Sequence, residues 1–460
     1  MILRRLNDDF VASLHGLMSE DEAHDLVAAL AETEPTVSVR LNRHKGGTLP
    51  SEAPHVPWCP LGAYLEGHPS FTFDPHFHGG RYYVQDASSM FLHHVITSLV
   101  HEPVAYLDLC AAPGGKTTTA LDALPEGSLV VANEVVPQRA LVLRDNVARW
   151  GNPCTAVTRD APTTLGSLGP IFDVVAADVP CSGEGMMRKD EEAAHQWSSE
   201  LVKQCANRQR AILADIWPAL KPGGLLLYST CTFNRHENEE IVEQLVNDFD
   251  AEPILIDTPT EWNIASGIDT PYPCYRFFPH RTRGEGLFVA VLRKPAGDIR
   301  SPRSSRNGGK NISCPEATQW LKDSERFALR TMGDAVFAIP REWSALIDLI
   351  SNKVHTLSIG VEMAVAKGRK TAPAHALALT TALKRDGFPT LEVDYATALA
   401  FLRGESLSIE APRGHVVLAF KGTPLGFVNN LGNRANNLYP KPLRILSAHS
   451  PSTPPQVLNI

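Results

Sequence analysis

Two cysteines of this chain stand where a thiol could act as a nucleophile. Cys181 lies in Asp-Val-Pro-Cys-Ser-Gly-Glu-Gly (residues 178–185), and Cys231 lies in Tyr-Ser-Thr-Cys-Thr (residues 228–232). Each segment directly follows an apolar run that is typical of a buried strand. A single buried cysteine is usually an inert core residue. Two cysteines at neighbouring strand ends instead predict thiol chemistry, and the residue pattern leaves open which of them attacks.

A glycine-rich turn precedes both cysteines and could hold a nucleotide-like ligand. It runs from Cys110 to Lys116 as Cys-Ala-Ala-Pro-Gly-Gly-Lys. Glycines allow close backbone approach, and the free N–H groups of a helix start favour polar ligand groups. Glu134 follows Gly114 by 20 residues, at the end of the next apolar run, where an acid accepts hydrogen bonds from ribose hydroxyls. The pair predicts an adenosyl ligand without separating a nicotinamide cofactor from S-adenosylmethionine.

These residues need a parallel sheet to bring them to one edge, and residues 104–293 have the corresponding pattern. Short apolar segments alternate with helix-forming ones, which is typical of an α/β fold with helices on both faces. Ligands of such sheets bind beyond the carboxyl ends of the strands. The expected strands are Val104–Leu109, Ser128–Asn133, Phe172–Asp178, Gly224–Ser229 and Leu287–Arg293, and the expected helices are Lys116–Leu124, Pro137–Trp150 and Glu200–Leu220.

The rest of the chain is less regular. The first 50 residues read as helical, with a capping box at Ser19–Glu22 before the apolar stretch Ala23–Leu30. Residues 51–80 look irregular, and residues 300–310 form a basic Ser/Gly-rich linker. Further on we expect strands Val416–Phe420 and Leu443–Leu446 around a helix, Tyr395–Leu402. The predicted parts are an N-terminal subdomain (1–95), a Rossmann-like domain (96–296), a linker (297–314), an intermediate region (315–384) and a C-terminal domain (385–460).

Composition excludes several classes of protein. The eight cysteines include no Cys-x-x-Cys pair, which argues against a disulfide scaffold and a structural zinc site, and no metal site is predicted. No apolar run reaches the ~18 residues of a membrane span. The first residues lack the apolar segment of a signal peptide, so we expect a cytoplasmic protein that does not enter a membrane.

Charge is distributed unevenly along the chain. Of 43 Lys and Arg, 20 follow residue 299, whereas only 12 of the 51 Asp and Glu do so. The net charge of −8 therefore hides a basic C-terminal part and a strongly acidic remainder. This balance favours an appended nucleic-acid-binding domain, although two unrelated solvated surfaces would give the same numbers.

Taken in order, four motifs resemble the Sun/Fmu family of RNA (cytosine-5) methyltransferases. They are Cys110–Lys116, Asp178–Gly185, Ser229–Glu237 and Arg276–Phe288. Arg40–Asn42 and Tyr83–Ser89 resemble further family segments, so the likeness covers roughly residues 1–295. Gly432–Lys441 is similar to the tail of the bacterial small-subunit ribosomal RNA methyltransferase F branch, whose counterpart is a PUA-like RNA-binding module.

The resemblance implies a class I, Rossmann-like methyltransferase core with an N-terminal helical subdomain and a C-terminal PUA-like α+β region. Cys231 would be the nucleophile, Cys181 would assist product release, and Asp178 would border both the cofactor and the target base. S-adenosylmethionine would be bound by Cys110, Ala111, Ala112, Pro113, Gly114, Gly115, Lys116, Glu134, Arg139, Asp160 and Asp178.

This assignment explains why the reaction needs a thiol nucleophile. Carbon 5 of cytosine is a poor nucleophile, and adding a thiolate to carbon 6 makes the ring enamine-like, so that carbon 5 can attack a methyl sulfonium. An acid near ring N3, for which Asp178 is the candidate, would stabilise the charge that develops. Loss of the carbon-5 proton then expels the thiol and restores aromaticity.

RNA is the implied partner of a monomeric enzyme. The resemblance implies a cytosine of 16S ribosomal RNA, which must leave its stack or lie in a single-stranded loop. Arg188, Lys189, Arg434 and Lys441 are the candidate phosphate contacts. Two alternatives stay open, a transfer RNA substrate and a non-catalytic ribosome-assembly factor, and a scaffold would have no need of both thiols.

Overall fold

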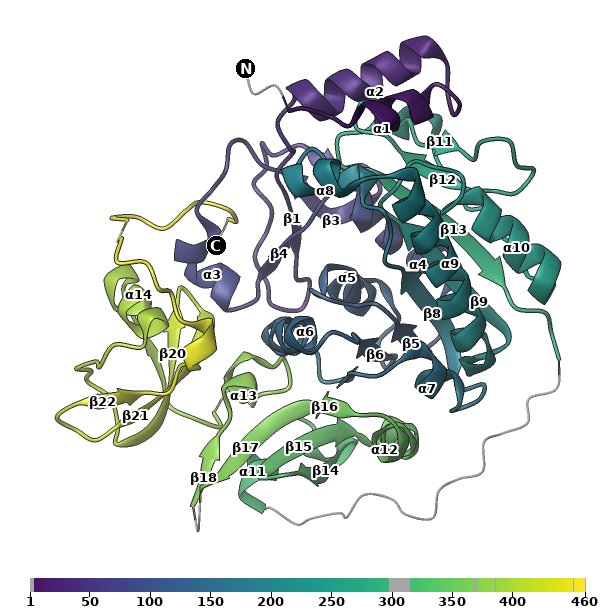
Figure 1. Cartoon of the computed structure of the whole chain (residues 1–460). Helices are drawn as coiled ribbons and strands as arrows, with labels where there is room; N and C mark the ends of the chain where they lie inside the picture. The colour runs from purple at the N-terminus through teal and green to yellow at the C-terminus, as the bar shows by residue number, and fades with distance from the viewer. Residues whose placement is uncertain (1–3, 298–314, 368–369, 385, 450, 460) are drawn as a thin grey trace.

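The computed structural model describes residues 4–297, 315–367, 370–384, 386–449 and 451–459, so the predicted basic linker lies outside the described residues. A large sheet crosses the molecule (Figure 1). Its parallel part has the order β9-β8-β5-β6-β7. These strands are β5 (Ala105–Asp108), β6 (Leu129–Asn133), β7 (Thr155–Thr158), β8 (Phe172–Asp178) and β9 (Leu220–Thr230). Because the order reverses at β5, a ligand site is expected beyond its carboxyl end.

Antiparallel strands extend the sheet beyond β9. β13 (Leu287–Arg293) pairs with β9, and β12 (Tyr275–Phe277) and β11 (Ala265–Ser266) follow. The short β10 (Glu252–Pro253) pairs with the other end of β13. This is a Rossmann-like sheet with an antiparallel margin, and the predicted strands are confirmed, although β9 begins four residues earlier than Gly224.

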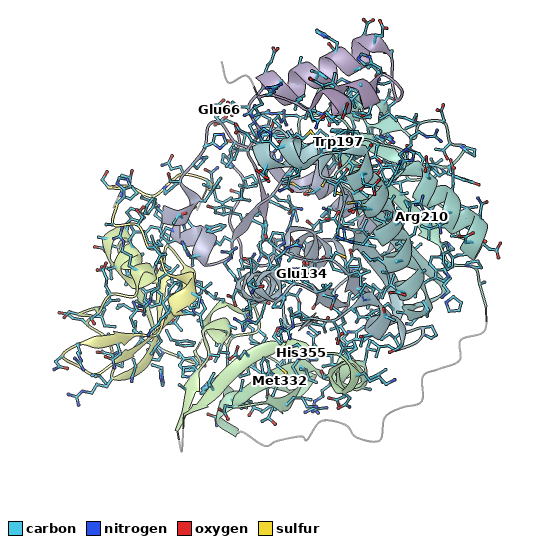
Figure 2. The ribbon with its side chains drawn as sticks, in the orientation of Figure 1. Glu66, Glu134, Trp197, Arg210, Met332 and His355 are labelled. Atoms are coloured by element: carbon cyan, nitrogen blue, oxygen red, sulfur yellow. The ribbon has the colours of Figure 1, made fainter. Side chains whose placement is uncertain are left out.

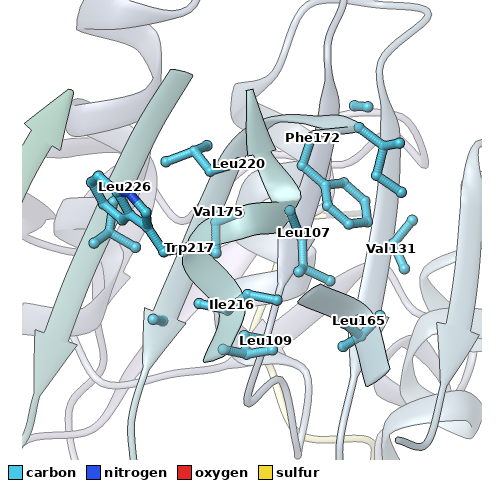
Figure 3. Close-up of a cluster of buried hydrophobic side chains, with 14 of the residues drawn as sticks. Leu107, Leu109, Val131, Leu165, Phe172, Val175, Ile216, Trp217, Leu220 and Leu226 are labelled. Atoms are coloured by element: carbon cyan, nitrogen blue, oxygen red, sulfur yellow. The ribbon is translucent and has the colours of Figure 1, made fainter. Parts of the chain in front are cut away.

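Helices cover both faces of the sheet. α7 (Pro162–Gly166), α9 (Ser199–Ile216) and α10 (Glu239–Phe249) pack on one face, and α4 (Phe91–Leu99) and α5 (Gly115–Ala123) pack on the other. Neighbouring residues of one strand alternate between the two faces, as Tyr106 and Leu107 do. Figure 3 shows the hydrophobic cluster on the face covered by α7, α9 and α10, in which Leu107, Val131 and Phe172 lie together. Each such fully buried side chain contributes roughly 1.5–3 kcal/mol, so the strand ends rest on a rigid base.

The N-terminal part contains more strand than the sequence predicted. α1 (Asp8–Leu14) and α2 (Glu20–Glu32) are helical, and Ser19 caps α2 by accepting a hydrogen bond from the Glu22 N–H. Residues 38–80 were expected to be helical or irregular, but they contribute β1 (Ser38–Leu41), β2 (His55–Val56) and β3 (Cys59–Tyr64), and β4 (Tyr82–Val84) follows. These strands form an antiparallel sheet, β2-β3-β1-β4. These strands are short and are separated by prolines and glycines. They contain too few apolar residues for the sequence to show the alternation of apolar and polar residues that is typical of a strand.

The region after residue 315 completes the central sheet. β14 (Phe327–Met332), β15 (Ala335–Pro340), β17 (Val361–Lys367) and β18 (Lys370–Pro373) form a separate antiparallel sheet. β16 (Thr356–Ile359) instead pairs with β7 and ends the large sheet. α11 (Pro315–Gln319), α12 (Ser344–Lys353) and α13 (His375–Leu379) accompany these strands. No helix among the described residues combines the length and apolarity that a membrane crossing requires.

The C-terminal domain is a small α+β unit that contacts the N-terminal part. It contains β19 (Thr390–Glu392), α14 (Tyr395–Arg403), β20 (Gly414–Phe420), β21 (Thr423–Asn430) and β22 (Ala435–Asn437). The helix and the strand at Val416–Phe420 are confirmed. The predicted strand at Leu443–Leu446 is wrong, because Pro440 and Pro442 remove backbone donors and the chain forms the 3-10 turn η8 (Lys441–Leu443). His76 and His78 of α3 (Pro75–His78) reach Thr423 and Tyr439, which fixes the domain beside α3 (Figure 1).

Candidate active site

The predicted site residues gather at the carboxyl edge of the parallel strands. Cys110 follows β5 by two residues, Glu134 follows β6, Asp178 ends β8 and Cys231 follows β9. β8 is hydrogen-bonded to β5 on one side and to β9 on the other. Cys181 follows Asp178 by three residues, so both thiols stand at this edge.

The two thiols are in direct contact. The sulfur atoms of Cys181 and Cys231 lie 3.0 Å apart, and the Cys231 N–H points at the Cys181 sulfur from 3.4 Å. The hydrogen bond with Cys231 and burial raise the pKa of the Cys181 thiol well above its usual value. A protonated Cys181 can therefore donate its S–H to a thiolate at Cys231, which stabilises that thiolate.

Asp178 links the thiol edge to the glycine-rich turn. Its Oδ2 accepts a hydrogen bond from Lys116 Nζ at 2.8 Å, and its Oδ1 accepts one from the Ser229 hydroxyl at 2.7 Å. Burial by itself would lower the pKa of Lys116, but the Asp178 carboxylate outweighs it and the pKa is raised. Lys116 thus stays charged and holds the carboxylate in place.

Two polar residues of this edge were not predicted from the sequence. Asp108 is buried, accepts a hydrogen bond from Thr117 Oγ1 at 2.6 Å, and has its pKa raised to about 7 chiefly by burial. Ser229 reaches Asp178. Both residues border a cavity of about 20 Å³, room for one water molecule, together with Lys116. Asp108 ends its strand as Asp178 does, and that shared position was the available signal.

The glycine-rich turn is shaped for a ligand and tied down from behind. Gly114 has φ of +113°, and a Cβ there would lie 3.3 Å from Leu143 Cδ1. From α6 (Pro137–Trp150), Arg139 donates to the Ala112 carbonyl at 2.9 Å, and Asn146 donates to the Pro113 carbonyl at 2.7 Å. The predicted Arg139 thus supports the turn through its backbone. Cys110 packs against the central core, and burial raises the pKa of its thiol, which fits a packing role.

Glu134 offers an acceptor without a donor. It is 3% exposed, and its Oε1 accepts the Val136 N–H at 2.9 Å. Its buried Oε2 accepts no hydrogen bond from the described residues, although Arg139 Nη1 lies 3.3 Å away. A buried acceptor that makes no hydrogen bond is costly, and a ribose diol carries the donors that this oxygen lacks. Glu134, which Figure 2 labels beside α6, therefore fits the adenosyl group of S-adenosylmethionine.

Asp160 lies just beyond the next strand along, and its carboxylate already accepts two backbone hydrogen bonds. It follows β7, and Asn133 at the end of β6 binds both its N–H and its carbonyl, each at 3.0 Å. Its carboxylate accepts the N–H groups of Ala161 and His355. Asp160 thus stands beside Glu134, with backbone groups around its carboxylate.

The four expected RNA contacts fall into two groups. Arg188 is 5% exposed, and its guanidinium binds Glu285, the Gly284 carbonyl and Thr33, so it holds loops together and cannot meet a phosphate. Burial of this arginine corrects the expectation from its sequence position. Lys189 is more exposed and lies 3.5 Å from Glu285. Arg434 and Lys441 are exposed in the C-terminal domain.

Known families match three parts of the chain. The model of 16S rRNA methyltransferase RsmB/F matches residues 97–293. The N-terminal domain of 16S rRNA methyltransferase RsmF matches residues 6–87, and the PUA domain of methyltransferase RsmF matches residues 388–445.

Curated relatives and solved structures agree with these matches. Ribosomal RNA small subunit methyltransferase F of Salmonella agona is 30% identical over 468 residues, 95% of this chain and 96% of that protein. The protein of the same name from Citrobacter koseri is 30% identical over 470 residues, with the same coverage. A methyltransferase homolog from Pyrococcus horikoshii (25% identity, TM-score 0.53) covers 63% of this chain and 95% of its own. NSun6 from Pyrococcus horikoshii with SFG (18% identity, TM-score 0.54, 63% of this chain and 98% of its own) shares the fold.

Proposed function

Because the chain belongs to the family of ribosomal RNA small subunit methyltransferase F, we propose that it methylates carbon 5 of a cytosine in 16S ribosomal RNA, with Cys231 as nucleophile. S-adenosylmethionine is the methyl donor. The observation that carries the proposal is the pair of thiols 3.0 Å apart beside Asp178. We favour ribosomal over transfer RNA because the relatives that match over 95% of this chain have a ribosomal name.

The residues around the turn bind and orient the cofactor in this proposal. The bound group supplies an electrophilic methyl on a sulfonium. Glu134 Oε2 accepts from the ribose hydroxyls, and the turn at 110–116 lies along the ligand, with Gly114 leaving room for close approach. Arg139 and Asn146 hold the turn rigid from α6. Asp160 borders the adenine side, next to Glu134.

Cys231 begins the reaction on the base. Its thiolate forms a bond to carbon 6, the carbon 5–carbon 6 π bond opens, and the charge that develops at ring N3 and O2 is neutralised by a proton at N3. Lys116 and Ser229 fix the carboxyl of Asp178 at the edge where N3 would lie. Water supplies that proton, and the Asp178 carboxylate accepts a hydrogen bond from the resulting N3–H, which loses the proton again when carbon 5 takes the methyl group. Carbon 5 is thereby activated to attack the methyl group.

Cys181 ends the reaction. Once Cys231 has become a thioether, the largest cause of the raised pKa at Cys181, its hydrogen bond with Cys231, is removed. The Cys181 thiol then releases its proton to water more readily, and the resulting thiolate accepts the carbon-5 proton. The electrons of that C–H bond restore the double bond and expel the Cys231 thiolate. The 3.0 Å distance between the two sulfur atoms supports this role, because Cys181 would then lie beside the bond that breaks.

The remaining parts deliver RNA in this proposal. Arg434 and Lys441 contact phosphates from the PUA-like domain, Lys189 contacts RNA beside the thiol edge, and the enzyme works as a cytoplasmic monomer. The division into parts 1–95, 96–296, 297–314, 315–384 and 385–460 is part of the proposal. The family matches to residues 6–87, 97–293 and 388–445 support three of these limits.

Substitution of each thiol tests the two roles. Cys231→Ala should abolish methyl transfer to 16S ribosomal RNA and leave cofactor affinity unchanged, because Cys231 contacts the base alone. Cys181→Ala should accumulate a covalent protein–RNA adduct that resists denaturing gel electrophoresis. Cys154→Ala, at a cysteine away from this edge, is the matched control and should do neither. Substantial turnover by Cys231→Ala would refute the assignment, and an adduct from Cys231→Ala alone would reverse the two roles.

A further inference from the structure

The loop after Cys181 carries a buried glutamate that binds the loop after Cys231. Glu184, at the start of η3 (Glu184–Met186), is 1% exposed. Its Oε2 accepts the N–H groups of Phe233 and Asn234, at 2.5 and 3.0 Å. Its Oε1 accepts the Trp197 Nε1–H and the Asn234 side-chain amide, both at 2.9 Å. Trp197 is labelled in Figure 2.

The loop after Cys231 returns the contact with a second glutamate. Glu237 is 0% exposed, and its Oε1 accepts the Ser182 N–H at 2.9 Å and the Gln209 side-chain amide at 2.8 Å. Its Oε2 accepts the Ser182 hydroxyl and the Asn234 amide. Ser182 is the residue next to Cys181, so Glu237 holds the backbone that carries this thiol. Asn234 touches both carboxylates and couples them.

All eight contacts come from neutral N–H and O–H donors, so no positive charge compensates the burial of the two carboxylates. Such an arrangement is costly, and its benefit is that it fixes the positions of the two loops. Burying a carboxylate is unfavourable unless its oxygens are fully hydrogen-bonded. Apolar residues of similar size would often stabilise a core as well or better. Two such carboxylates, each on one thiol loop and bound to the other loop, restrain the separation of the loops directly. The Gly185 N–H adds a backbone bond to the Cys231 carbonyl at 2.8 Å.

We propose that Glu184 and Glu237 form a carboxylate clasp that holds the two thiols at reacting distance, with Glu237 as the positioning residue for Cys181. The proposal rests on the roles of Cys181 and Cys231 given above and extends them. Neither glutamate touches substrate or cofactor in it. The clasp therefore governs turnover, whereas RNA affinity and cofactor affinity come from other residues.

Glutamine at position 237 is the sharpest probe, because it keeps the size and removes one acceptor. Four donors face the carboxylate, and an amide offers one oxygen to them while its NH₂ group meets N–H or O–H donors. The loop of Cys181 should then shift. A misplacement near 1 Å costs on the order of 100-fold in rate. Glu240→Gln, three residues further along the chain and with a partly exposed side chain, is the matched control.

The experiment measures kcat and KM for RNA, cofactor affinity by calorimetry, and thiol spacing in the full-length protein. Spacing is read as the rate at which diamide, taking up two electrons and two protons, converts Cys181 and Cys231 to a disulfide without RNA or cofactor. For Glu237→Gln we expect kcat to fall on the order of 10- to 100-fold, the disulfide to form several-fold more slowly, and KM and cofactor affinity to stay within about threefold. Glu240→Gln should match the wild type throughout.

Wild-type kcat and disulfide rate in Glu237→Gln would overturn the clasp. Should that variant not fold, Ser182→Ala decides, because it deletes one hydroxyl and keeps the backbone bond to Glu237. A smaller slowing of both rates is expected there, and unchanged rates would overturn the proposal. Turnover by Cys231→Ala would instead overturn the proposed function, and the diamide rates would still report on the clasp.

Discussion

At the scale of single residues, the sheet edge holds three carboxylates in three electrostatic settings. Asp178 is bound by Lys116. Glu134 has a buried oxygen without a hydrogen-bond donor among the described residues. Asp108 is buried beneath them with its pKa raised. The same chemical group is therefore suited to orient a base, to accept from a ligand, and to hold a proton, because burial and neighbours differ.

Loss of Glu134 should weaken cofactor binding. In the proposed function Glu134 accepts from two ribose hydroxyls, so Glu134→Ala should cost on the order of 1–3 kcal/mol, or roughly 5- to 150-fold in affinity. Isothermal titration calorimetry with S-adenosylmethionine measures the change. Glu126→Ala, at an exposed glutamate, should bind like the wild type. Equal affinities for all three proteins would place the ribose elsewhere.

Asp108 should make stability depend on pH. Burial raises its pKa from 3.8 to about 7, so between these values the folded protein binds more protons than the unfolded chain. The free energy of unfolding therefore falls as pH rises through this window. Asp108→Asn lacks this dependence, and the stability of the wild type relative to the variant should decline from pH 4.5 to pH 7.5 in urea titrations. A constant difference would contradict the protonation of Asp108 in the fold.

At the scale of elements, loops far apart in the sequence are joined by buried ion pairs. Arg188 of the loop after η3 binds Glu285 in the loop before β13, and also Thr33 at the end of α2. The side chains of Arg188 and Glu285 are 5% and 3% exposed. The N-terminal helices thus support the loop that carries Cys181, which gives the N-terminal subdomain a part in the site.

Arg188→Ala should destabilise the protein strongly. Glu285 would stay buried without its guanidinium, a loss on the order of 3 kcal/mol. Lys189→Ala, at the neighbouring residue with a more exposed and longer ion pair, should change stability by less than about 1 kcal/mol. Urea denaturation of both variants gives the comparison. A weakened RNA affinity of Arg188→Ala with wild-type stability would restore the phosphate contact that its sequence position suggested.

The sequence predicted the strands and loops that carry the proposed catalytic residues better than the long-range contacts that hold them in place. The apolar strands and the motifs after them are local patterns, so β5, β6, β8 and both cysteines could be located. The partner of Arg188 lies 97 residues away, and no local pattern reveals it. The pairing of β16 with β7 is equally non-local. Glu184 and Glu237 lie inside the motifs Asp178–Gly185 and Ser229–Glu237, but their burial depends on loops that only the fold brings together.

At the scale of the whole molecule, acidic and basic parts are joined in one chain. The C-terminal domain, in which seven Lys and Arg face five Asp and Glu, lies beside α3, next to the N-terminal subdomain (Figure 1). Arg434 and Lys441 are exposed on it. RNA can thus be attracted by one part of the molecule while chemistry takes place in an acidic part that would repel it.

The salt dependence of RNA binding tests this division. Each lost phosphate contact lowers the slope of log affinity against log salt by roughly 0.7–0.9. Arg434→Ala/Lys441→Ala should therefore bind RNA more weakly at low salt, with a slope reduced by about 1.5. Lys203→Ala/Arg208→Ala, at exposed positions of α9, should keep the wild-type slope. Identical slopes for all proteins would mean that the C-terminal charge is only solvated surface.

The pairing of β16 with β7 has a consequence for biosynthesis. Every residue of the proposed site has been translated by residue 237, yet the strand that closes the central sheet ends at Ile359. A ribosome adding 5–20 residues per second needs on the order of ten seconds for that interval. During it the backbone of β7 is an open edge, the kind of surface that pairs with other nascent chains. The yield of the expressed protein, and how far the chain can be shortened from its C-terminal side, should therefore depend on β16, a strand that contributes no residue to the proposed site.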